Sequence, residues 1–349
     1  MLQRSLFRAH SLHLPKRCSY LPPSNFFSTT TATPKPRPFY TTPFFTIPTA
    51  FLLGYATYAY TTATTQIYPI NPYTFTKHTV KSTIPLSPSS ALITLSPSRP
   101  TIPPEGFWKI IYREGVWSVQ IKQPQLQIQR EYTPLPTINS DENGNEITIF
   151  VRAVGGGEVS PYLLSRKEGD VVEVRGPVVT YPFLSSEGGG EEAGIRNVLF
   201  IAGGTGVSPA VQLSSYLLSQ TDGVPRRVKI LFASRTSSET PIPHLKELQK
   251  LGDGKKGVKV DIEFFHDDRD TFIRKPDIEA AVSSLELGGG DGKGGRDVIV
   301  VSGPEGFVEY YAGKKGWEGG FETQGVLAGL VGEVVRGRKK GGKIEVMKL

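Results

Sequence analysis

The sequence predicts an α/β plus all-β protein, in which a small antiparallel β-barrel precedes an α/β domain built on a parallel sheet. The chain has 349 residues, which suits two domains of roughly 100–200 residues each. From residue 72 to 184, short segments of alternating apolar and polar residues are separated by Pro and Gly, as antiparallel strands are. From residue 196 onward, continuous apolar segments alternate with segments of helical period, which is typical of a parallel sheet covered by helices.

An N-terminal targeting and anchor segment is predicted before these domains. Residues 1–43 are rich in Arg, Ser and Thr, lack Asp and Glu, and carry scattered Leu and Phe, which is the pattern of a mitochondrial transit peptide. Residues 44–62 are uncharged and contain FFTIPTAFLLGYATYAY, at the short limit for a bilayer span. We expect a single inner-membrane anchor there. The alternatives are a disordered tail for the first segment and a peripheral tether for the second.

Charge and cysteine content exclude several classes of function. The formal net charge is +7, but no Asp or Glu precedes Glu105, so the excess of Lys and Arg belongs to the N-terminal part. The remainder is nearly balanced and offers no basic surface to a phosphate backbone, so we expect no nucleic-acid binding. The single cysteine, Cys18, falls in the predicted transit peptide. This excludes disulfides, thiol nucleophiles and cysteine-ligated metals, and no two His are spaced as ligands, so no metal site is expected.

The barrel domain, residues 72–184, is predicted from its short strands. The candidate strands are 74–80, 91–95, 108–112, 116–121, 126–132, 146–154 and 171–175. Several alternate apolar and polar residues, as half-buried strands do. Six or so such strands joined by turns suggest a small closed barrel.

The α/β domain, residues 196–349, follows a Gly- and Glu-rich linker at 185–195. Its strands are predicted at 197–201, 227–233, 258–265 and 297–301, and its helices at 207–219, 244–251, 278–287 and 305–314. Because strand and helix alternate, helices are expected on both faces of the sheet. The Gly-rich loop 286–296 is expected to carry no chemistry, and an apolar, then basic, C-terminal extension ends the domain.

The first candidate motif is REYTPLP at 130–136, at the end of a predicted strand. Alternation places Arg130 and Tyr132 on one side of that strand. The guanidinium of Arg130 can hold a phosphate or pyrophosphate, and the ring of Tyr132 can stack on an aromatic ring system. Thr133, beside a turn fixed by Pro134, can place a hydroxyl or an amide at the edge of that ring system. Taken alone, the motif is better explained as a cross-strand pair beside a turn.

Two glycine-containing motifs follow apolar strands of the α/β domain. GGTGVSP at 203–209 follows NVLFI and opens a helix, and SGPEGF at 302–307 follows DVIVV. Glycine lets a ligand approach backbone amides, and loops at the carboxyl ends of parallel strands line the crevice in which cofactors bind. Each motif is weak alone. Together, in this order and after a barrel, the three motifs predict a site for two nucleotide cofactors, one of them a flavin.

The chain resembles the cytochrome b5 reductase-like branch of the ferredoxin–NADP reductase superfamily over residues 73–313. The motifs that carry the resemblance are, in order, REYTP at 130–134, GEVSPYL at 157–163, GDVVEVRGP at 169–177, GGTGVSP at 203–209 and SGP at 302–304. The resemblance implies that the barrel binds FAD and that the α/β domain binds NADH or NADPH. It also implies an FAD-dependent NAD(P)H oxidoreductase that passes electrons to a haem or cytochrome acceptor.

The resemblance also assigns roles to residues. Tyr132 would lie against the flavin ring and Thr133 would hydrogen-bond near its reactive nitrogen; with Ser302 they are the expected catalytic residues. The other expected FAD-binding residues are Arg130, Val151, Arg152, Gly157, Val159 and Ser160. The expected contacts of the nicotinamide nucleotide are Gly203, Gly204, Thr205, Gly206, Pro209, Ser234, Arg235, Gly303 and Pro304. Arg235 could favour a 2′-phosphate and thus NADPH, and NADH stays open.

One departure narrows the resemblance. Ser302 stands where the family usually has Cys, which implies slower hydride transfer or another physiological donor. This serine, the leader, the anchor and the C-terminal extension make the chain similar to fungal mitochondrial FAD reductases that assist haem attachment to cytochrome c. Such a protein would face the intermembrane space from the inner membrane, with cytochrome c or haem lyase as its partner. The alternatives are an ordinary mitochondrial NADH–cytochrome b5 reductase and a non-catalytic assembly factor that keeps the flavoprotein fold.

Overall fold

The computed structural model divides the chain into two compact units, Met1–Ala63 and Thr64–Leu349. The described residues all belong to the second unit and are 68–101, 107–108, 111, 115–136, 145–182, 195–219, 225–237, 243–254, 257–288, 296–338 and 342–349. The predicted transit peptide, the predicted anchor at 44–62 and all but the last residue of the predicted linker lie outside them. No helix among the described residues is long and apolar enough to cross a membrane.

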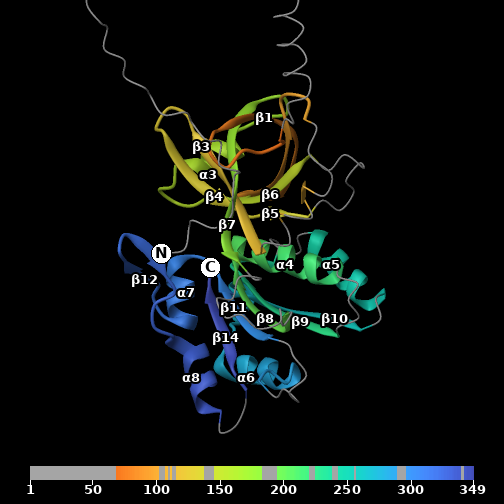
Figure 1. Cartoon of the computed structure of the whole chain (residues 1–349), viewed down its shortest axis with the longest axis vertical. Coiled ribbons are helices and arrows are strands. Elements are labelled where there is room, and N and C mark those ends of the chain that lie inside the picture. Colours follow the sequence, from red (N-terminus) through yellow and green to blue (C-terminus); the bar gives the residue numbers. More distant parts are fainter. Residues whose placement is uncertain are drawn as a thin grey trace, which may run out of the picture. The chain divides into compact units, whose positions relative to one another are not determined.

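An antiparallel sheet of seven strands forms the first domain (Figure 1). In chain order its strands are β1 (Thr76–Ser87), β2 (Ser90–Pro97), β3 (Gly115–Gln123), β4 (Ile128–Tyr132), β5 (Pro134–Leu135), β6 (Ile147–Arg152) and β7 (Val171–Pro182). The spatial order is β4-β3-β7-β1-β2-β6-β5. Since only Thr133 separates β4 from β5, the two ends of this order meet and the sheet curls into a barrel-like shape. The predicted barrel is thus confirmed.

The barrel interior is filled by alternate residues of its strands. Ile93 and Leu95 of β2, Val119 and Ile121 of β3, and Ile149 of β6 are fully buried in one cluster. A short helix, α3 (Val159–Leu164), adds its apolar side chains to the same cluster. Residues that point to the other face of these strands, such as Leu92 of β2 and Phe150 of β6, are buried in a second cluster.

The prediction of a strand at 108–112 is wrong. Of its region, Phe107, Trp108 and Ile111 are described, and all three are helical. Their spacing of three and four residues puts them on one face of a helix. From that face they pack against the barrel interior, where the Trp108 ring lies 5.8 Å from that of Trp117.

A parallel sheet of five strands forms the second domain. Its strands are β8 (Ile195–Gly203), β9 (Arg226–Ser234), β10 (Val258–His266), β11 (Arg296–Ser302) and β14 (Ile344–Lys348), in the spatial order β10-β9-β8-β11-β14. Its helices are α4 (Val207–Ser219), α5 (Pro243–Gly254), α6 (Lys275–Ser284), α7 (Glu305–Ala312) and α8 (Gly329–Gly337). Between α7 and α8 lies a hairpin formed by β12 (Gly316–Glu318) and β13 (Phe321–Thr323).

The helices cover both faces of this sheet, as predicted. Alternate residues of β8 point to opposite faces, with Val198 and Phe200 in one apolar cluster and Leu199 and Ile201 in another. The first cluster contains residues of α4 and α5, and the second contains residues of α6, α7 and α8. The first cluster also includes barrel residues of β2, β3, β5 and β6, so α4 and the barrel share one core.

The C-terminal extension is part of the fold. The sequence predicted only an apolar and then basic extension, but α8 packs beside α6 and α7, and β14 pairs in parallel with β11. Lys348 of β14 is buried, and its ammonium group donates to the carbonyls of Lys314 and Val326, at 2.9 Å each. The side-chain amide of Gln324 donates to the backbone carbonyl of Lys348 and accepts its backbone N–H. These bonds tie the segment before α8 to the end of β14.

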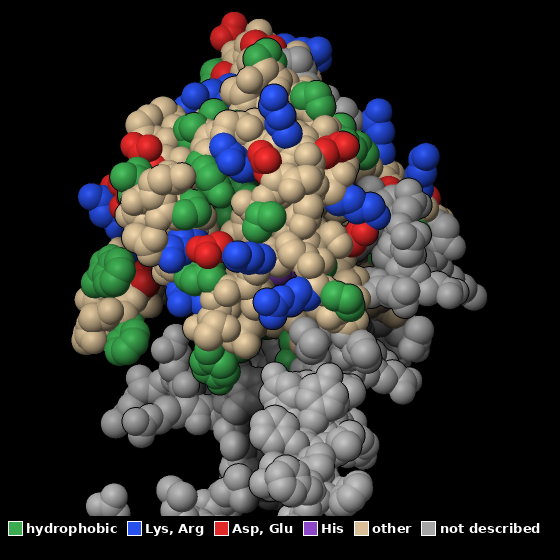
Figure 2. Space-filling model, turned by 90° about the horizontal axis from the view of Figure 1, so that it is seen from above, with side chains coloured by type: hydrophobic (Ala, Val, Ile, Leu, Met, Phe, Trp, Pro, Cys, Tyr) green, Lys and Arg blue, Asp and Glu red, His purple; other side chains and the backbone are tan. Residues whose placement is uncertain are grey.

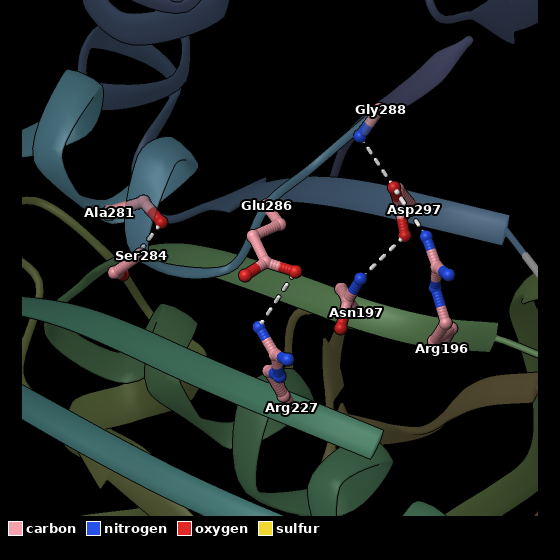
Figure 3. Close-up of polar contacts among 8 residues, drawn as sticks. All are labelled: Arg196, Asn197, Arg227, Ala281, Ser284, Glu286, Gly288 and Asp297. Carbon is pink, nitrogen blue, oxygen red and sulfur yellow. Dashed lines mark hydrogen bonds and ion pairs between the residues drawn. The ribbon is translucent and has the colours of Figure 1, made fainter. Parts of the chain in front are cut away.

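A buried carboxylate connects several segments at the edge of the sheet where its parallel strands begin, the amino edge (Figure 3). Asp297, at the start of β11, is 4% exposed and accepts hydrogen bonds from the side chain of Asn197 at 2.9 Å and the backbone of Gly288 at 2.5 Å. Arg196 lies 3.5 Å from the same carboxylate. Asp297 thereby connects β8, β11 and the segment after α6.

The charges of the described surface are mixed. On the face that Figure 2 shows, Lys and Arg side chains are interspersed with Asp and Glu side chains. This agrees with the near balance of charge that the sequence has after residue 104.

Candidate functional site

Two of the predicted motifs meet at the carboxyl edge of the parallel sheet. β8 and β11 are adjacent and in register, with Ser302 opposite Ala202, so the loops that follow them start side by side. The first loop contains a short 3₁₀ helix, η1 (Gly204–Gly206), and leads directly into α4. The second loop leads into α7. The structure therefore brings together GGTGVSP and SGPEGF, which lie about a hundred residues apart in the sequence.

The close approach of these loops requires glycine. A β-carbon at Gly203 would lie 2.8 Å from Cδ2 of Phe307. At Gly206, the added atom would overlap the carbonyl oxygen of Ser302. Gly204 has a φ of 55°, in the left-handed region that favours glycine. Packing between the loops is thus a second reason for this glycine pattern, besides room for a ligand.

A cavity of about 400 Å³ opens at the same edge. Its walls come from the ends of β6, β8 and β9 and from the segments after β10 and β11. Six of the predicted site residues line it: Arg152, Gly203, Gly204, Ser234, Arg235 and Pro304. Arg152 belongs to the barrel and the others belong to the α/β domain, so both domains build the cavity wall.

Five other predicted residues of these motifs do not line this cavity: Thr205, Gly206, Pro209, Ser302 and Gly303. Gly206 and Pro209 are buried, and Ser302 is 3% exposed. Ser302, which stands where the resemblance expects cysteine, is therefore packed beneath the loops.

Eight residues of the cavity wall were not predicted as site residues, and three of them, Asp267, Phe272 and Tyr310, offer a charge or an exposed ring to a ligand. Asp267 directly follows β10, so the rule that places ligand loops at carboxyl ends of strands would have found it. Phe272 and Tyr310 are large apolar side chains with 47% and 61% exposure. Exposed rings in a cavity wall can stack on a planar ligand.

Buried hydrogen bonds hold the segment after β9. The hydroxyl of Ser234 donates to the carbonyl of Thr236 at 3.0 Å and lies 2.9 Å from Nδ1 of His266. Because the hydroxyl has only one proton, Nδ1 of His266 is the donor of the second bond. Ser234 therefore fixes the loop that carries Arg235, rather than offering a free hydroxyl to a ligand.

Asp268 ties the same loop to the segment after β10. Its carboxylate accepts the backbone N–H of Ser237 at 2.9 Å and the Ser237 hydroxyl at 3.0 Å. The backbone bond, with the hydroxyl bond and nearby positive charge, lowers the pKa of Asp268 below its ordinary value. The backbone N–H of Asp268 donates to the carbonyl of Arg235 at 3.1 Å. Arg235 and Asp267 are thereby presented together, both exposed, at the cavity wall.

The REYTPLP motif lies where β4 and β5 meet. Tyr132 pairs with Val119 and Arg130 with Ile121, which confirms that Arg130 and Tyr132 share one side of β4. Tyr132 is half-buried against the barrel interior. Burial raises the pKa of its phenol to about 12, although the charge of Arg130 opposes the shift. Arg130 is exposed and donates to the backbone carbonyl of Gln129 at 2.8 Å.

The residues predicted after β6 build a tight turn. The backbone N–H of Gly157 donates to the carbonyl of Val154 at 2.9 Å, and the Ser160 hydroxyl accepts the N–H of Val154 at 3.1 Å. The side chains of Val151 and Val159 are buried in the barrel interior, so only their backbones are available to a ligand.

Arg152 connects this turn with the cavity. Its Nη1 atom lies 3.3 Å from the position that a β-carbon would take at Gly204. The guanidinium therefore lies beside the backbone of η1, where a ligand of the α/β domain can reach it. The resemblance implied a place for Arg152 beside the FAD ribityl chain, and the structure places this residue on the cavity wall.

Two family models match consecutive parts of the chain. The oxidoreductase FAD-binding domain matches residues 111–183, and the oxidoreductase NAD-binding domain matches residues 200–312. Together they cover more than half of the chain, and they correspond to the barrel and the parallel sheet.

Relatives at modest identity agree with this assignment. The chain is 31% identical over 153 residues to an uncharacterized FAD-binding protein of Schizosaccharomyces pombe, covering 44% of this chain and 51% of the relative. It is 27% identical over 142 residues to the cytochrome c mitochondrial import factor CYC2 of Saccharomyces cerevisiae, covering 37% and 38%. It is 26% identical over 232 residues to NADH-cytochrome b5 reductase 2-B of Vanderwaltozyma polyspora, covering 63% and 65%. The chain thus spans less than two thirds of the length of each of these curated relatives.

A solved structure shares the fold. The cytochrome b5 reductase domain of Ulva prolifera nitrate reductase superposes with a TM-score of 0.54 at 17% sequence identity, covering 81% of this chain and all of that domain. The order of a barrel-like antiparallel sheet and a parallel α/β sheet is the same order that the two family models give. The chain therefore belongs to the ferredoxin reductase family, as its motifs predicted.

Proposed function

We propose that the protein is an FAD-dependent oxidoreductase that takes reducing equivalents from NADH or NADPH and passes electrons to a haem or cytochrome acceptor. The observation that carries this proposal is the cavity built by both domains, in which Arg152 of the barrel lies beside Gly204 of the α/β domain. A nucleotide held there would have one end at the sheet edge and the other toward the barrel. Such an arrangement is what transfer between two bound cofactors requires.

The barrel residues fit an FAD molecule. Arg130 is exposed and can reach a pyrophosphate, and the neutral ring of Tyr132 can lie against a flat ring system. Thr133 joins β4 to β5 at the adjoining corner. A β-carbon at Gly155 or Gly156 would meet no described atom within 4 Å, which leaves room for a ligand beside the turn. FAD, when bound, would accept a hydride and deliver single electrons.

The cavity residues fit a pyridine dinucleotide. Gly203 and Gly204 expose backbone beside the start of α4, where a phosphate is favoured. The guanidinium groups of Arg152 and Arg235 can pair with phosphates, and Phe272 can stack on a base. The phenol of Tyr132, with a pKa near 12, is neutral, and Ser302 is buried, so we assign neither group a role as acid or base. We propose that these residues bind and orient the cofactors and exclude water.

We further propose that the acceptor belongs to the haem-attachment machinery of cytochrome c at the mitochondrial inner membrane. Two features support this finer proposal: the acid-free, Arg- and Ser-rich composition of residues 1–43 and the similarity to the yeast cytochrome c mitochondrial import factor. An NADH–cytochrome b5 reductase is the second candidate, and it is supported by the Vanderwaltozyma relative, whose name states that activity. Rapid NADH-dependent reduction of soluble cytochrome b5 would favour the second candidate.

The test is the visible absorption spectrum of the purified full-length chain before and after anaerobic addition of NADH or NADPH. We expect flavin bands that bleach with at least one nucleotide. Bands that persist with both nucleotides would mean that the flavin receives its electrons from a reductant other than NADH or NADPH. A colourless chain that takes up no added FAD would contradict the proposal and favour a non-catalytic assembly factor. Arg130→Ala and Tyr132→Ala should weaken FAD binding, and unchanged function of both variants in cells would argue against either enzyme.

A further inference from the structure

A buried glutamine of the α/β domain bonds to the barrel backbone. Gln212, on α4, is 1% exposed. Its Oε1 accepts the backbone N–H of Trp117 at 3.0 Å, and its Nε2 donates to the carbonyls of Trp117 and Pro134, at 3.1 Å each. Both amide protons and the amide oxygen are therefore used in bonds to β3 and β5.

The position of this amide follows from the register of the barrel. β3 and β4 pair from Gln123 opposite Ile128 to Val119 opposite Tyr132. Two residues further in the same register, Trp117 would stand opposite Pro134. Proline has no N–H, so this rung of the ladder cannot form directly. The amide of Gln212 takes its place, since it bonds to the N–H and C=O of Trp117 and to the C=O of Pro134.

This inserted amide lies beside the corner at Thr133. It bonds to both β3 and β5 immediately after Tyr132, where the chain turns away from β3 at the residues expected to meet the flavin. The same amide belongs to the helix that starts at Val207, directly after η1. One side chain thus connects the flavin-side corner with the helix that follows the nucleotide loop.

We propose that Gln212 is a positioning residue, which fixes Tyr132 and Thr133 relative to η1 and thereby sets the distance between the two cofactors. The proposal rests on the proposed reductase function. Packing of α4 on the barrel is not directional, whereas three hydrogen bonds to two strands fix both distance and orientation. Neither a shorter nor an ionised side chain reproduces them: asparagine lacks a methylene group, and a glutamate carboxylate has no donor.

Two variants and one control separate positioning from packing. Gln212→Leu removes all three bonds and replaces the amide by an apolar side chain of similar size. Gln212→Glu keeps the shape and replaces both donors by an acceptor that faces two carbonyls. The control, Leu217→Ala, truncates another buried residue of α4 in the same core without touching these bonds. Urea unfolding would show that control and variants lose comparable stability.

The first readout does not depend on activity. In the FAD-loaded full chain, we expect the amide of Trp117 to exchange with deuterium at least about tenfold faster in Gln212→Leu, which offers that N–H no acceptor, than in Leu217→Ala. The visible circular dichroism of the bound flavin should change in the two Gln212 variants and stay unchanged in the control. Exchange and dichroism that do not distinguish the variants from the control would overturn the proposal.

The second readout is hydride transfer, followed by anaerobic stopped-flow at saturating nucleotide. We expect a rate constant about ten- to a hundredfold lower in both Gln212 variants, because small displacements of reacting groups have effects of this size. The nucleotide KM should change by less than about threefold, since the cavity residues are intact. A rate within about twofold of wild type, or an equal loss in Leu217→Ala, would overturn the proposal. If wild-type flavoprotein is reduced by neither nucleotide, the reductase function fails, and exchange and dichroism alone decide the role of Gln212.

Discussion

Gly206 lies directly against the backbone carbonyl of Ser302, with no room for a β-carbon between them. This contact joins the loop after β8 to the loop after β11, and Phe307 closes the same junction over Gly203. The two motifs that the sequence shows separately are thus one packed structure at the carboxyl edge of the sheet.

Substitution of Gly206 should therefore damage the junction. We expect Gly206→Ala to lower the free energy of unfolding by about 1–3 kcal/mol, because a methyl group forced into a packed site displaces backbone. Urea denaturation would measure the loss. Gly306→Ala is the matched control, since a β-carbon at Gly306 in α7 meets no described atom within 4 Å. We expect that variant to be neutral or slightly stabilised, because alanine favours a helix over glycine.

His244 makes the stability of the fold dependent on pH. It lies on α5, is 8% exposed, and bonds to the backbone of Pro136, which can only accept through its carbonyl. Burial lowers the pKa of His244 from 6.5 to about 4, although the bond to Pro136 opposes the shift. As pH falls from 6.5 toward 4, the unfolded chain binds a proton that the folded chain does not bind. Stability is therefore present above pH 6.5 and is lost through this window.

The contribution of His244 can be isolated by substitution. At pH 4 the loss approaches about 3 kcal/mol, since one pKa unit corresponds to about 1.4 kcal/mol. In His244→Gln, the amide can still donate to Pro136 but does not titrate. We expect wild type to lose more stability than His244→Gln between pH 7 and pH 4.5, as measured by urea denaturation. Parallel pH profiles of the two proteins would show that the ring does not contribute.

Asp297 should matter for stability and not for the cofactor sites. Asp297→Asn removes the charge that Asn197, Gly288 and Arg196 surround at the amino edge of the sheet. We expect a loss of about 2–3 kcal/mol, the size of hydrogen bonds to a charged group. Thermal unfolding would measure it, and FAD affinity should stay unchanged because the site lies at the opposite edge.

A neighbouring ion pair provides the control for Asp297. Arg227 and Glu286 lie 3.4 Å apart in the same region (Figure 3), but both are exposed, at 45% and 72%. Glu286→Gln should cost at most about 1 kcal/mol, as exposed pairs do. Equal losses in Asp297→Asn and Glu286→Gln would contradict the role of the buried carboxylate.

Arg235 and Asp267 should set the choice between NADH and NADPH. They stand together at the cavity wall, where a guanidinium would attract a 2′-phosphate and a carboxylate would repel it. We expect Arg235→Ala to lower kcat/KM for NADPH about tenfold and to leave NADH within about threefold. Asp267→Asn should raise kcat/KM for NADPH relative to NADH. Arg269→Ala, an exposed cation of the same loop outside the cavity wall, is the control.

The sequence predicts the α/β strands and helices well because their apolar runs are continuous and their order is regular. It fails at Phe107, Trp108 and Ile111, where three large apolar residues in a short segment suit a strand and a helical face equally. The C-terminal extension escapes prediction because its glycines obscure the period of α8. These failures concern segments whose conformation is decided by what they pack against.

In the site, too, some residues can be predicted from local motifs and others cannot. Glycines, Arg130 and Tyr132 stand in recognisable motifs, whereas Gln212 is an ordinary helical residue until the register of β3 and β4 reveals a rung that proline cannot complete. Arg152 likewise reaches the cavity through the contact of two domains. Such roles depend on residues far apart in the chain, so no local pattern contains them.

The pairing of β14 with β11 also covers an edge that the sheet would otherwise leave open. Without β14, the strand β11, whose residues Val298–Val301 are all buried, would present an open row of N–H and C=O groups on an apolar strand. Such an edge is a template for pairing with another chain. β14 instead ends the sheet with a strand in which the charged residue Glu345 interrupts the apolar residues. The extension after α7 thus places the apolar strand β11 inside the sheet, between β8 and β14.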